Sequence, residues 1–311
     1  MRPLRLPSAT RPRTRRFSYR RLFFGNLATG VGTVCGLVVL VFVTVVPLLS
    51  PYDPTRLDAS NRLLAPSWSH WLGTDDLGRD VLVRLAEGGR LSLVCAVGAV
   101  ACAAVLGAVV GALCGYLGGV VDAVLMRVAD ALQGFPQVLL ALLVAAGLGR
   151  GMAATTAATA VAYWPYFAKI TRGLVRQVRG ALYVQAAVAQ GAGVAYVLRR
   201  HLLPQTATAL FTQATMAVGE AIVFISGLSL IGLGAQEPTP EWGLIIAQSA
   251  GFVLQAWWYP TFAGLALFLA VLSANLLGDA LRENLGFGSG AASRRGIRRR
   301  TPPPAAVDET L

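Results

Sequence analysis

Residues 183–205 read YVQAAVAQGAGVAYVLRRHLLPQ, a short polar interruption in a very apolar chain. Ala186 and Ala187 are strong helix formers with almost no side chain, so a helix at the start of this stretch could approach a partner closely. Gly191 would stop that helix, because glycine tolerates the backbone angles of a sharp exit. Pro204 is a natural start or kink for the next helix. The stretch has the form of a docking element, although an ordinary loop between two membrane helices fits the same spacing.

The order Ala186-Ala187, Gly191, Leu203-Pro204 resembles the cytoplasmic coupling loop of permease subunits of bacterial ATP-binding-cassette (ABC) importers. The ending, Arg200-His201-x-Leu203-Pro204, is similar to the dipeptide and oligopeptide branch. In that family the loop forms short helices that sit in a groove of the ATPase subunit. The resemblance implies a coupling set in which the first four residues contact the ATPase and the arginines help to orient the loop: Gln185, Ala186, Ala187, Gly191, Arg199, Arg200, Leu203 and Pro204.

The composition indicates a membrane protein. Of 311 residues, 55% are hydrophobic and 14% are charged, whereas about a quarter are charged in a soluble domain. The net charge of +12 would be compatible with nucleic-acid binding, but the basic residues are not spread over a soluble domain and form no nucleic-acid motif. The four cysteines lie in hydrophobic runs without zinc-ligand spacing, so we interpret them as packing residues.

The single lysine, Lys169, is not part of a phosphate-binding loop. Such a loop needs the pattern G-x-x-x-x-G-K-[ST] to hold phosphates. The chain is therefore expected to be neither an ATPase nor a cofactor enzyme, and ATP and magnesium would be bound by a partner.

Hydrophobic runs predict six membrane spans in an all-α protein. The first, 27–49, has 23 residues without a charge, enough to cross a hydrocarbon core of about 30 Å at about 1.5 Å per residue. The predicted spans are 27–49, 91–116, 131–149, 151–168, 207–234 and 256–278. Residues 1–26 and 286–311 would be basic, disordered cytoplasmic tails, and 169–206 would be the coupling loop. With both termini inside, 21 of the 27 Lys and Arg residues lie on the inner side, as the positive-inside rule requires.

Other motifs extend the resemblance to about residues 20–285. They are HWLGTD at 70–75, GRDVL at 78–82, PTPEWG at 238–243 and NLLGD at 275–279. In the first of the outer loops, Asp75, Asp76 and Asp80 lack EF-hand spacing, so we expect ion pairs with Arg79 and Arg84 there. The resemblance implies a type I ABC importer-like permease fold in a bacterial inner membrane.

Glu220 is the one acid deep in a predicted span. Burial of a charged side chain at that depth costs about 2.5 to 3.5 kcal/mol on insertion scales. Glu220 is therefore the candidate for the translocation path, where it would meet a substrate amine. Structural pairing with a neighbouring subunit is the alternative.

By resemblance, the chain supplies half a pore. The complete complex would contain a second, related permease, two ATPase subunits and an extracytoplasmic solute-binding protein docked on residues 50–90 and 235–255, all at a lipid bilayer. Peptides are the expected cargo, with a nickel complex or another small solute left open. An ion-coupled secondary transporter would be expected to have paired broken helices or internal repeats, and a membrane enzyme would need a cluster of catalytic groups. Neither feature is evident in the sequence.

Overall fold

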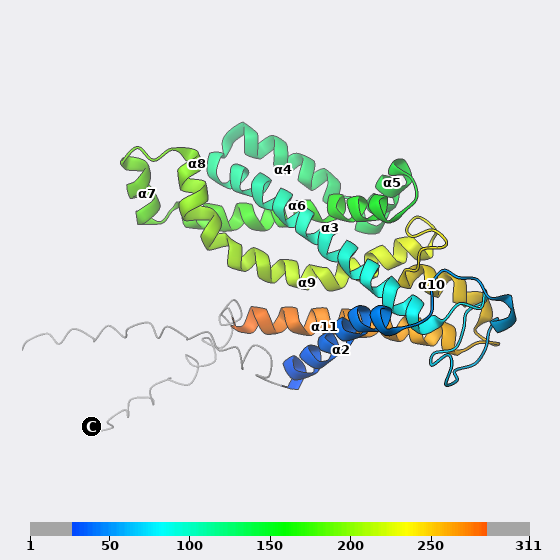
Figure 1. Ribbon diagram of the computed structural model, residues 1–311. Coiled ribbons are helices and arrows are strands. Elements are labelled where there is room, and N and C mark those ends of the chain that lie inside the picture. Colours follow the sequence, from blue (N-terminus) through cyan, green and yellow to red (C-terminus); the bar gives the residue numbers. More distant parts are fainter. Residues whose placement is uncertain (1–26, 285–311) are drawn as a thin grey trace, which may run out of the picture.

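The computed structural model describes residues 27–284, and this part of the chain consists of helices and loops (Figure 1). The two tails predicted at 1–26 and 286–311 lie outside the described residues. The α-helices are α2 (Leu27–Leu49), α3 (Val81–Leu117), α4 (Gly119–Gln133), α5 (Gln137–Leu148), α6 (Met152–Arg179), α7 (Leu182–Ala189), α8 (Val194–Val197), α9 (Leu203–Leu230), α10 (Trp242–Ser249) and α11 (Trp258–Asn284). Short helical turns are η1 (Ala59–Asn61), η2 (Leu198–Leu202) and η3 (Ala250–Phe252).

The all-α membrane class is confirmed, whereas the count of six spans is not. Within residues 27–284, four helical stretches are long and apolar enough to cross a membrane: Leu27–Leu49, Val81–Leu117, Val194–Leu230 and Trp258–Glu283. A fifth is formed if α4 and α5 are one bent span. The run predicted as the fourth span, 151–168, falls within the 28-residue α6, whose polar threonines and basic end lower its hydropathy.

The predicted third span, 131–149, with a kink expected at Pro136, is sharply bent in the structure, and the turn expected around Asp122 is helical. Those residues belong to α4 and α5, which meet at an angle of 97°. Gly134 and Pro136 lie between the two helices. Proline has no N–H to donate and disfavours a helical residue before it, so the chain bends there.

Helix α3 begins ten residues before the predicted start of its span, at Val81 rather than residue 91. The Asp80 carboxylate accepts a hydrogen bond from the Val83 N–H at 3.1 Å and caps the helix. The charge of Arg84 makes the first turn of α3 look like part of a loop in the sequence. In the structure this charge is neutralised, because the Arg84 Nε lies 3.2 Å from the buried Asp75 carboxylate.

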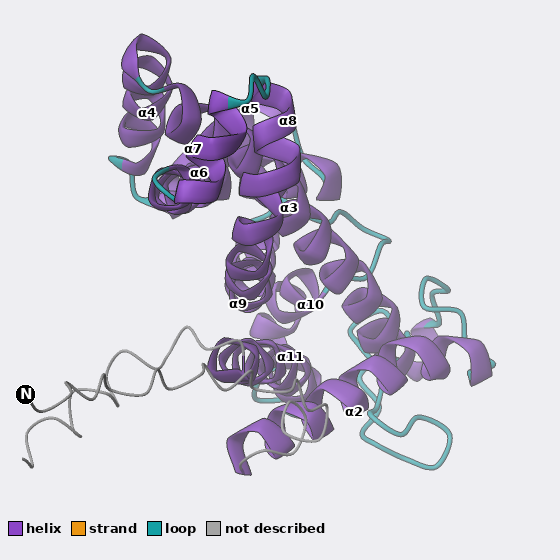
Figure 2. Ribbon diagram, turned by 90° about the vertical axis from the view of Figure 1, so that its left-hand side faces the viewer, coloured by secondary structure: helices purple, strands orange, loops and turns teal. Residues whose placement is uncertain are grey.

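Glycines on α3 let α6 approach closely along most of its length. A Cβ at Gly111 would lie 2.3 Å from the Ala168 carbonyl oxygen, and one at Gly107 would lie 2.5 Å from the Phe167 side chain. Such small-residue contacts are a common basis of helix association in membranes. Helices α2 and α11 lie side by side along another part of the bundle (Figure 2).

At the end of the bundle that contains α10, residues 235–255 pack against the first turns of α3. The Trp242 ring lies against Gly89, where an added Cβ would be 2.3 Å away, and its Nε1–H donates to the Leu85 carbonyl at 2.8 Å. Residues 235–255, predicted to be a loop, thus contain helix α10. The Glu241 carboxylate starts it by accepting from the Leu244 N–H at 3.0 Å.

The ion pairs predicted in the first loop are partly as expected. Asp75 pairs with Arg79 at 2.7 Å and with Arg84 at 3.2 Å. Asp80 instead pairs with His70 at 2.9 Å, because it points back from the helix start toward the loop. Asp76 makes no ion pair among the described residues.

Candidate functional site

Helix α7 follows the end of α6 after a turn at Gly180 and Ala181. It ends in a Schellman motif: the Gly191 N–H donates to the Val188 carbonyl at 2.9 Å, and the Ala192 N–H donates to the Ala187 carbonyl at 3.1 Å. Gly191 has a φ of +86°, a value that glycine adopts without the steric cost paid by other residues. The sequence therefore predicted the position of this helix end and its cause.

The second half of the loop is one continuous helix from Val194 to Leu230. Pro204 lies in the first turn of α9, as predicted for a helix start, but α9 follows α8 and η2 without a gap, so Pro204 does not separate two helices. The π-turn η2 widens the helix, with the Leu203 N–H bonded to the Leu198 carbonyl. This wider turn leaves room for a proline that cannot donate a helical hydrogen bond.

A small apolar cluster fastens the loop to the ends of α3 and α6. Its buried members are Ala112, Val175, Val184, Val197 and Leu202. The half-buried Leu203 packs against the same cluster. Leu203 is thus a packing residue of the loop rather than an exposed contact. The cluster thus joins α7, α8 and η2 to the two long helices α3 and α6.

The residues of α7 that were predicted to contact an ATPase differ in their exposure. Gln185 and Ala186 are exposed, and Ala187 is half-buried. Leu182 is 83% exposed and shares a helical face with Ala186, four residues later. Leu182 is therefore a further candidate contact of the loop. It was not among the predicted contacts, because Leu182 immediately precedes the stretch 183–205.

Arg199 and Arg200 are exposed and line a shallow cavity with Ala195 and Tyr196. The His201 ring lies between Tyr183 and Tyr196, with centroid distances of 5.9 and 5.7 Å. These ring contacts join α7 and α8 to η2, which the sequence did not predict.

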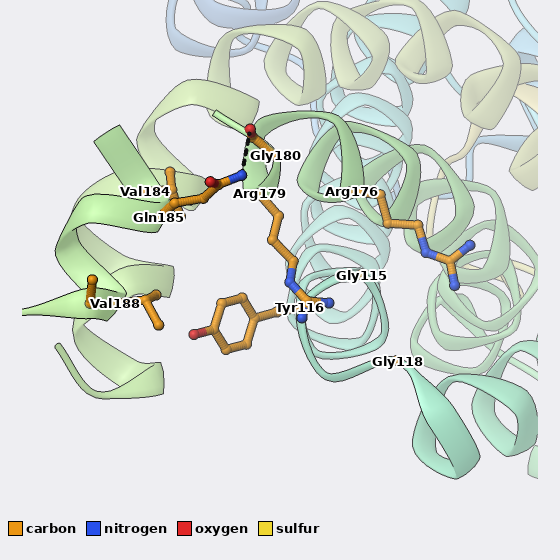
Figure 3. Close-up of a pocket in the computed structure, with 10 residues that line it drawn as sticks. Gly115, Tyr116, Gly118, Arg176, Arg179, Gly180, Val184, Gln185 and Val188 are labelled. Atoms are coloured by element: carbon orange, nitrogen blue, oxygen red, sulfur yellow. Dashed lines mark hydrogen bonds between the residues drawn. The ribbon is translucent and has the colours of Figure 1, made fainter. Parts of the chain in front are cut away.

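Beneath α7 lies a larger cavity, of about 680 Å³ (Figure 3). It is bounded by the ends of α3 and α6 and by the inner side of α7. The Arg179 guanidinium lies over the Tyr116 ring at 5.4 Å, and the Gln185 side-chain N–H donates to the Gly180 carbonyl at 3.1 Å.

Ion pairs between the acids of α4 and the basic residues of α6 join these two helices near the cavity. Asp122 accepts two hydrogen bonds from Arg172, at 2.5 and 2.6 Å, and one from Arg176 at 2.6 Å. Eight residues later on α4, Asp130 pairs with Lys169 at 2.6 Å. The cations lie on one face of α6 at spacings of three and four residues. This arrangement holds α4, and hence the bend before α5, against the helix that leads into α7.

Glu220 lies on α9, where the structure leaves it exposed at the bundle surface. The Tyr163 hydroxyl, on α6, donates to its carboxylate at 3.3 Å. Glu220 is far along the chain from the coupling residues and is not part of the loop described above. Within residues 27–284, no group of three His, Cys, Asp or Glu side chains could hold a metal ion.

Residues 107–288 match a family of known proteins, the binding-protein-dependent transport system inner membrane components. The chain belongs to this family. The match spans more than half of the protein and includes the end of α3 and every element from α4 to α11. The chain is thus a membrane permease component of a transport system that also uses a solute-binding protein.

Several relatives resemble this permease over most of its length. It is 36% identical over 282 residues to the probable D,D-dipeptide transport system permease protein DdpC of Escherichia coli, covering 89% of this chain and 95% of the relative. A putative peptide permease of Brucella suis is 38% identical over 280 residues, covering 89% and 92%. The glutathione transport system permease protein GsiD of Pectobacterium atrosepticum is 36% identical over 279 residues, covering 88% and 93%.

Proposed function

We propose that this permease forms half of the translocation pore of an ATP-driven importer for peptides, with residues 169–206 coupling the pore to a separate ATPase. The single observation that carries the coupling role is α7, a short helix with an exposed outer face and an inner face packed onto the ends of α3 and α6. The relatives named for dipeptide, peptide and glutathione transport support the peptide cargo.

In this proposal both termini and the α7 loop lie in the cytoplasm, and the loops before α3 and around α10 receive the solute-binding protein. A second, related permease completes the pore, and two ATPase subunits drive it. ATP binding would bring the ATPases together and move α7. To convert a population ratio of 1:99 into 99:1, the two states must differ in binding by about 5.5 kcal/mol, so α7 must be fixed firmly to α3 and α6. The apolar cluster beneath α7 supplies that attachment.

The test compares Gly191→Val with Gly193→Val. A Cβ meets no atom within 4 Å at either position, but Gly191 has a φ of +86° whereas Gly193 has −69°. Valine is strongly disfavoured at positive φ, so only Gly191→Val should misplace the end of α7. We expect Gly191→Val to abolish ATP-driven peptide uptake and reduce the amount of ATPase that co-purifies, while Gly193→Val keeps both. Equal behaviour of the two variants would refute the coupling role of α7.

A further inference from the structure

The cavity beneath α7 has an excess of positive charge. Arg172, Arg176 and Arg179 surround it or lie beside it, and Arg172 and Arg176 share the single carboxylate of Asp122. Among residues 27–284, Arg179 has no ion-pair partner and contacts the face of Tyr116. Three guanidinium groups and one carboxylate leave a net charge of +2 at this place. Such a concentration of cations in a concave site attracts an anion.

The walls of the cavity are apolar on one side and cationic on the other. Val184, Val188 and Ala189 contribute the apolar wall from α7, and Arg176 and Arg179 contribute the cationic wall from α6. Figure 3 shows the Arg179 side chain running between α7 and the end of α3 toward Tyr116. A ligand that fits must combine an anionic group with an apolar part.

The depth of the cavity relative to the bilayer follows from α3. This helix is one of the stretches apolar enough to span a membrane, and it ends at Leu117. Tyr116 and Gly118, which line the cavity, lie at the end of this apolar helix, so we infer that the cavity is close to the membrane–water interface. Tyrosine is enriched at that level, and basic pockets at helix ends bind lipid head groups.

We propose that this cavity binds the phosphate group of an anionic phospholipid, with Arg179 as the main contact and Arg176 as the second. The acyl chains would follow the apolar wall toward the bilayer, and the bound lipid would support α7 from its membrane side. An acidic side chain of a partner protein would leave the apolar wall of Val184, Val188 and Ala189 without a contact, so the lining favours a lipid, whose acyl chains can cover it. The proposed lipid site does not depend on the coupling role of α7. Only the assignment of the lipid to the cytoplasmic leaflet of the bilayer rests on the proposed orientation.

The test measures lipid binding to the full chain purified in mild detergent, by native mass spectrometry. The probes are dioctanoyl phosphatidylglycerol, dioctanoyl phosphatidylcholine and inorganic phosphate. We expect preferential binding of phosphatidylglycerol, and a five- to tenfold weakening, roughly the effect of one interfacial cation or slightly more, in Arg179→Gln. Arg199→Gln is the matched control, since it removes the same charge from an exposed position of the same loop, and it should leave the affinity unchanged.

A second variant reduces the space in the cavity without changing its charge. Ala189→Trp keeps every cation but places a large ring at the cavity wall, so it should also weaken phosphatidylglycerol binding. This variant also provides the test if Arg179→Gln does not fold. Equal weakening by Arg179→Gln and Arg199→Gln would overturn the proposal in favour of general charge attraction, and equal binding of inorganic phosphate would overturn it in favour of a phosphate site. Loss of co-purified ATPase in Arg179→Gln with unchanged lipid affinity would assign the cavity to a protein partner.

Discussion

At the scale of single residues, Leu182 is the side chain of α7 with most to gain from a partner. It is 83% exposed, whereas the other large hydrophobic side chains exposed on α7, Tyr183 and Val188, are 44% and 46% exposed. Full burial of a leucine contributes about 1.5 to 3 kcal/mol, and interface anchors of this kind often dominate binding. The alanines beside it add little energy themselves but permit close approach of a second surface.

We therefore predict that Leu182→Ser lowers the affinity for the ATPase by about tenfold or more. The fold should be unaffected, since the side chain contributes little to the interior. Quantification of the co-purified ATPase provides the measurement. Leu254→Ser is the control, because Leu254 is fully exposed, at 100%, after α10. If both variants lose ATPase equally, or neither does, Leu182 is not the anchor.

A second residue-scale prediction concerns Glu220. Its carboxylate is exposed on α9 and accepts one hydrogen bond from the Tyr163 hydroxyl. We predict that Glu220→Gln impairs transport more than assembly, because the amide keeps the hydrogen bond but lacks the charge that would attract a substrate amine. Uptake rate and complex yield are measured side by side, with Tyr163→Phe as the control that removes only the hydrogen bond. Equal loss of uptake and assembly in Glu220→Gln would instead indicate a structural role.

At the scale of elements, the ion pairs between α4 and α6 hold a bent helix pair in place. The two acids differ in their surroundings. The Asp122 side chain is 10% exposed and accepts three hydrogen bonds, whereas the Asp130 side chain is 55% exposed. Desolvated, multiply bonded pairs are costly to break, while exposed pairs typically contribute about 0 to 1 kcal/mol.

We predict that Asp122→Asn lowers the free energy of unfolding by about 2 kcal/mol and increases hydrogen exchange in α4. Asp130→Asn should change the same free energy much less, because solvent screens its exposed ion pair. Thermal unfolding in detergent and hydrogen exchange along α4 provide the measurements. If the two substitutions have the same effect, the bend is held by apolar packing and not by the Asp122 network.

The same element scale explains where prediction from the sequence failed. Asp122, Arg127 and Asp130 lie between the predicted spans 91–116 and 131–149, where a turn was expected. In the structure these residues belong to α4, where the cations of α6 pair with its acids. A single segment cannot reveal that the charge of Asp122 is neutralised by arginines 50 and 54 residues away in the chain. Likewise, the π-turn before Pro204 depends on packing of η2 against α3 and α6.

At the scale of the whole molecule, one ion pair joins the loop before α3 to the loop before α10. The Arg79 guanidinium lies 2.7 Å from the Glu237 carboxylate, 158 residues away in the sequence. The hydrogen bond from Arg79 holds the pKa of Glu237 below its ordinary value. Arg79 itself is buried, but the Glu237 side chain is 43% exposed, so solvent weakens the pair.

This linkage predicts a pH dependence. A lowered folded-state pKa means that the stabilisation is fully present above the ordinary pKa of glutamate, about 4.3, and is lost as the pH falls through the lower folded value. We expect the loss to amount to about 1 kcal/mol. Thermal unfolding between about pH 3 and pH 6 should show this component in the natural protein, and it should be absent in Glu237→Gln. An unchanged pH profile in the variant would contradict the assignment.

The sequence by itself determined the membrane class, the end of α7 at Gly191 and the family, because hydropathy, glycine conformation and short motifs are local properties of the chain. Only the tertiary structure decided the 97° bend between α4 and α5, the continuous helix through Pro204 and the cavity lined by Arg176 and Arg179. It also paired Arg79 with Glu237. These features arise where segments distant in sequence exclude water together, so the cost of a buried charge or a missing hydrogen bond depends on neighbours that no local pattern specifies.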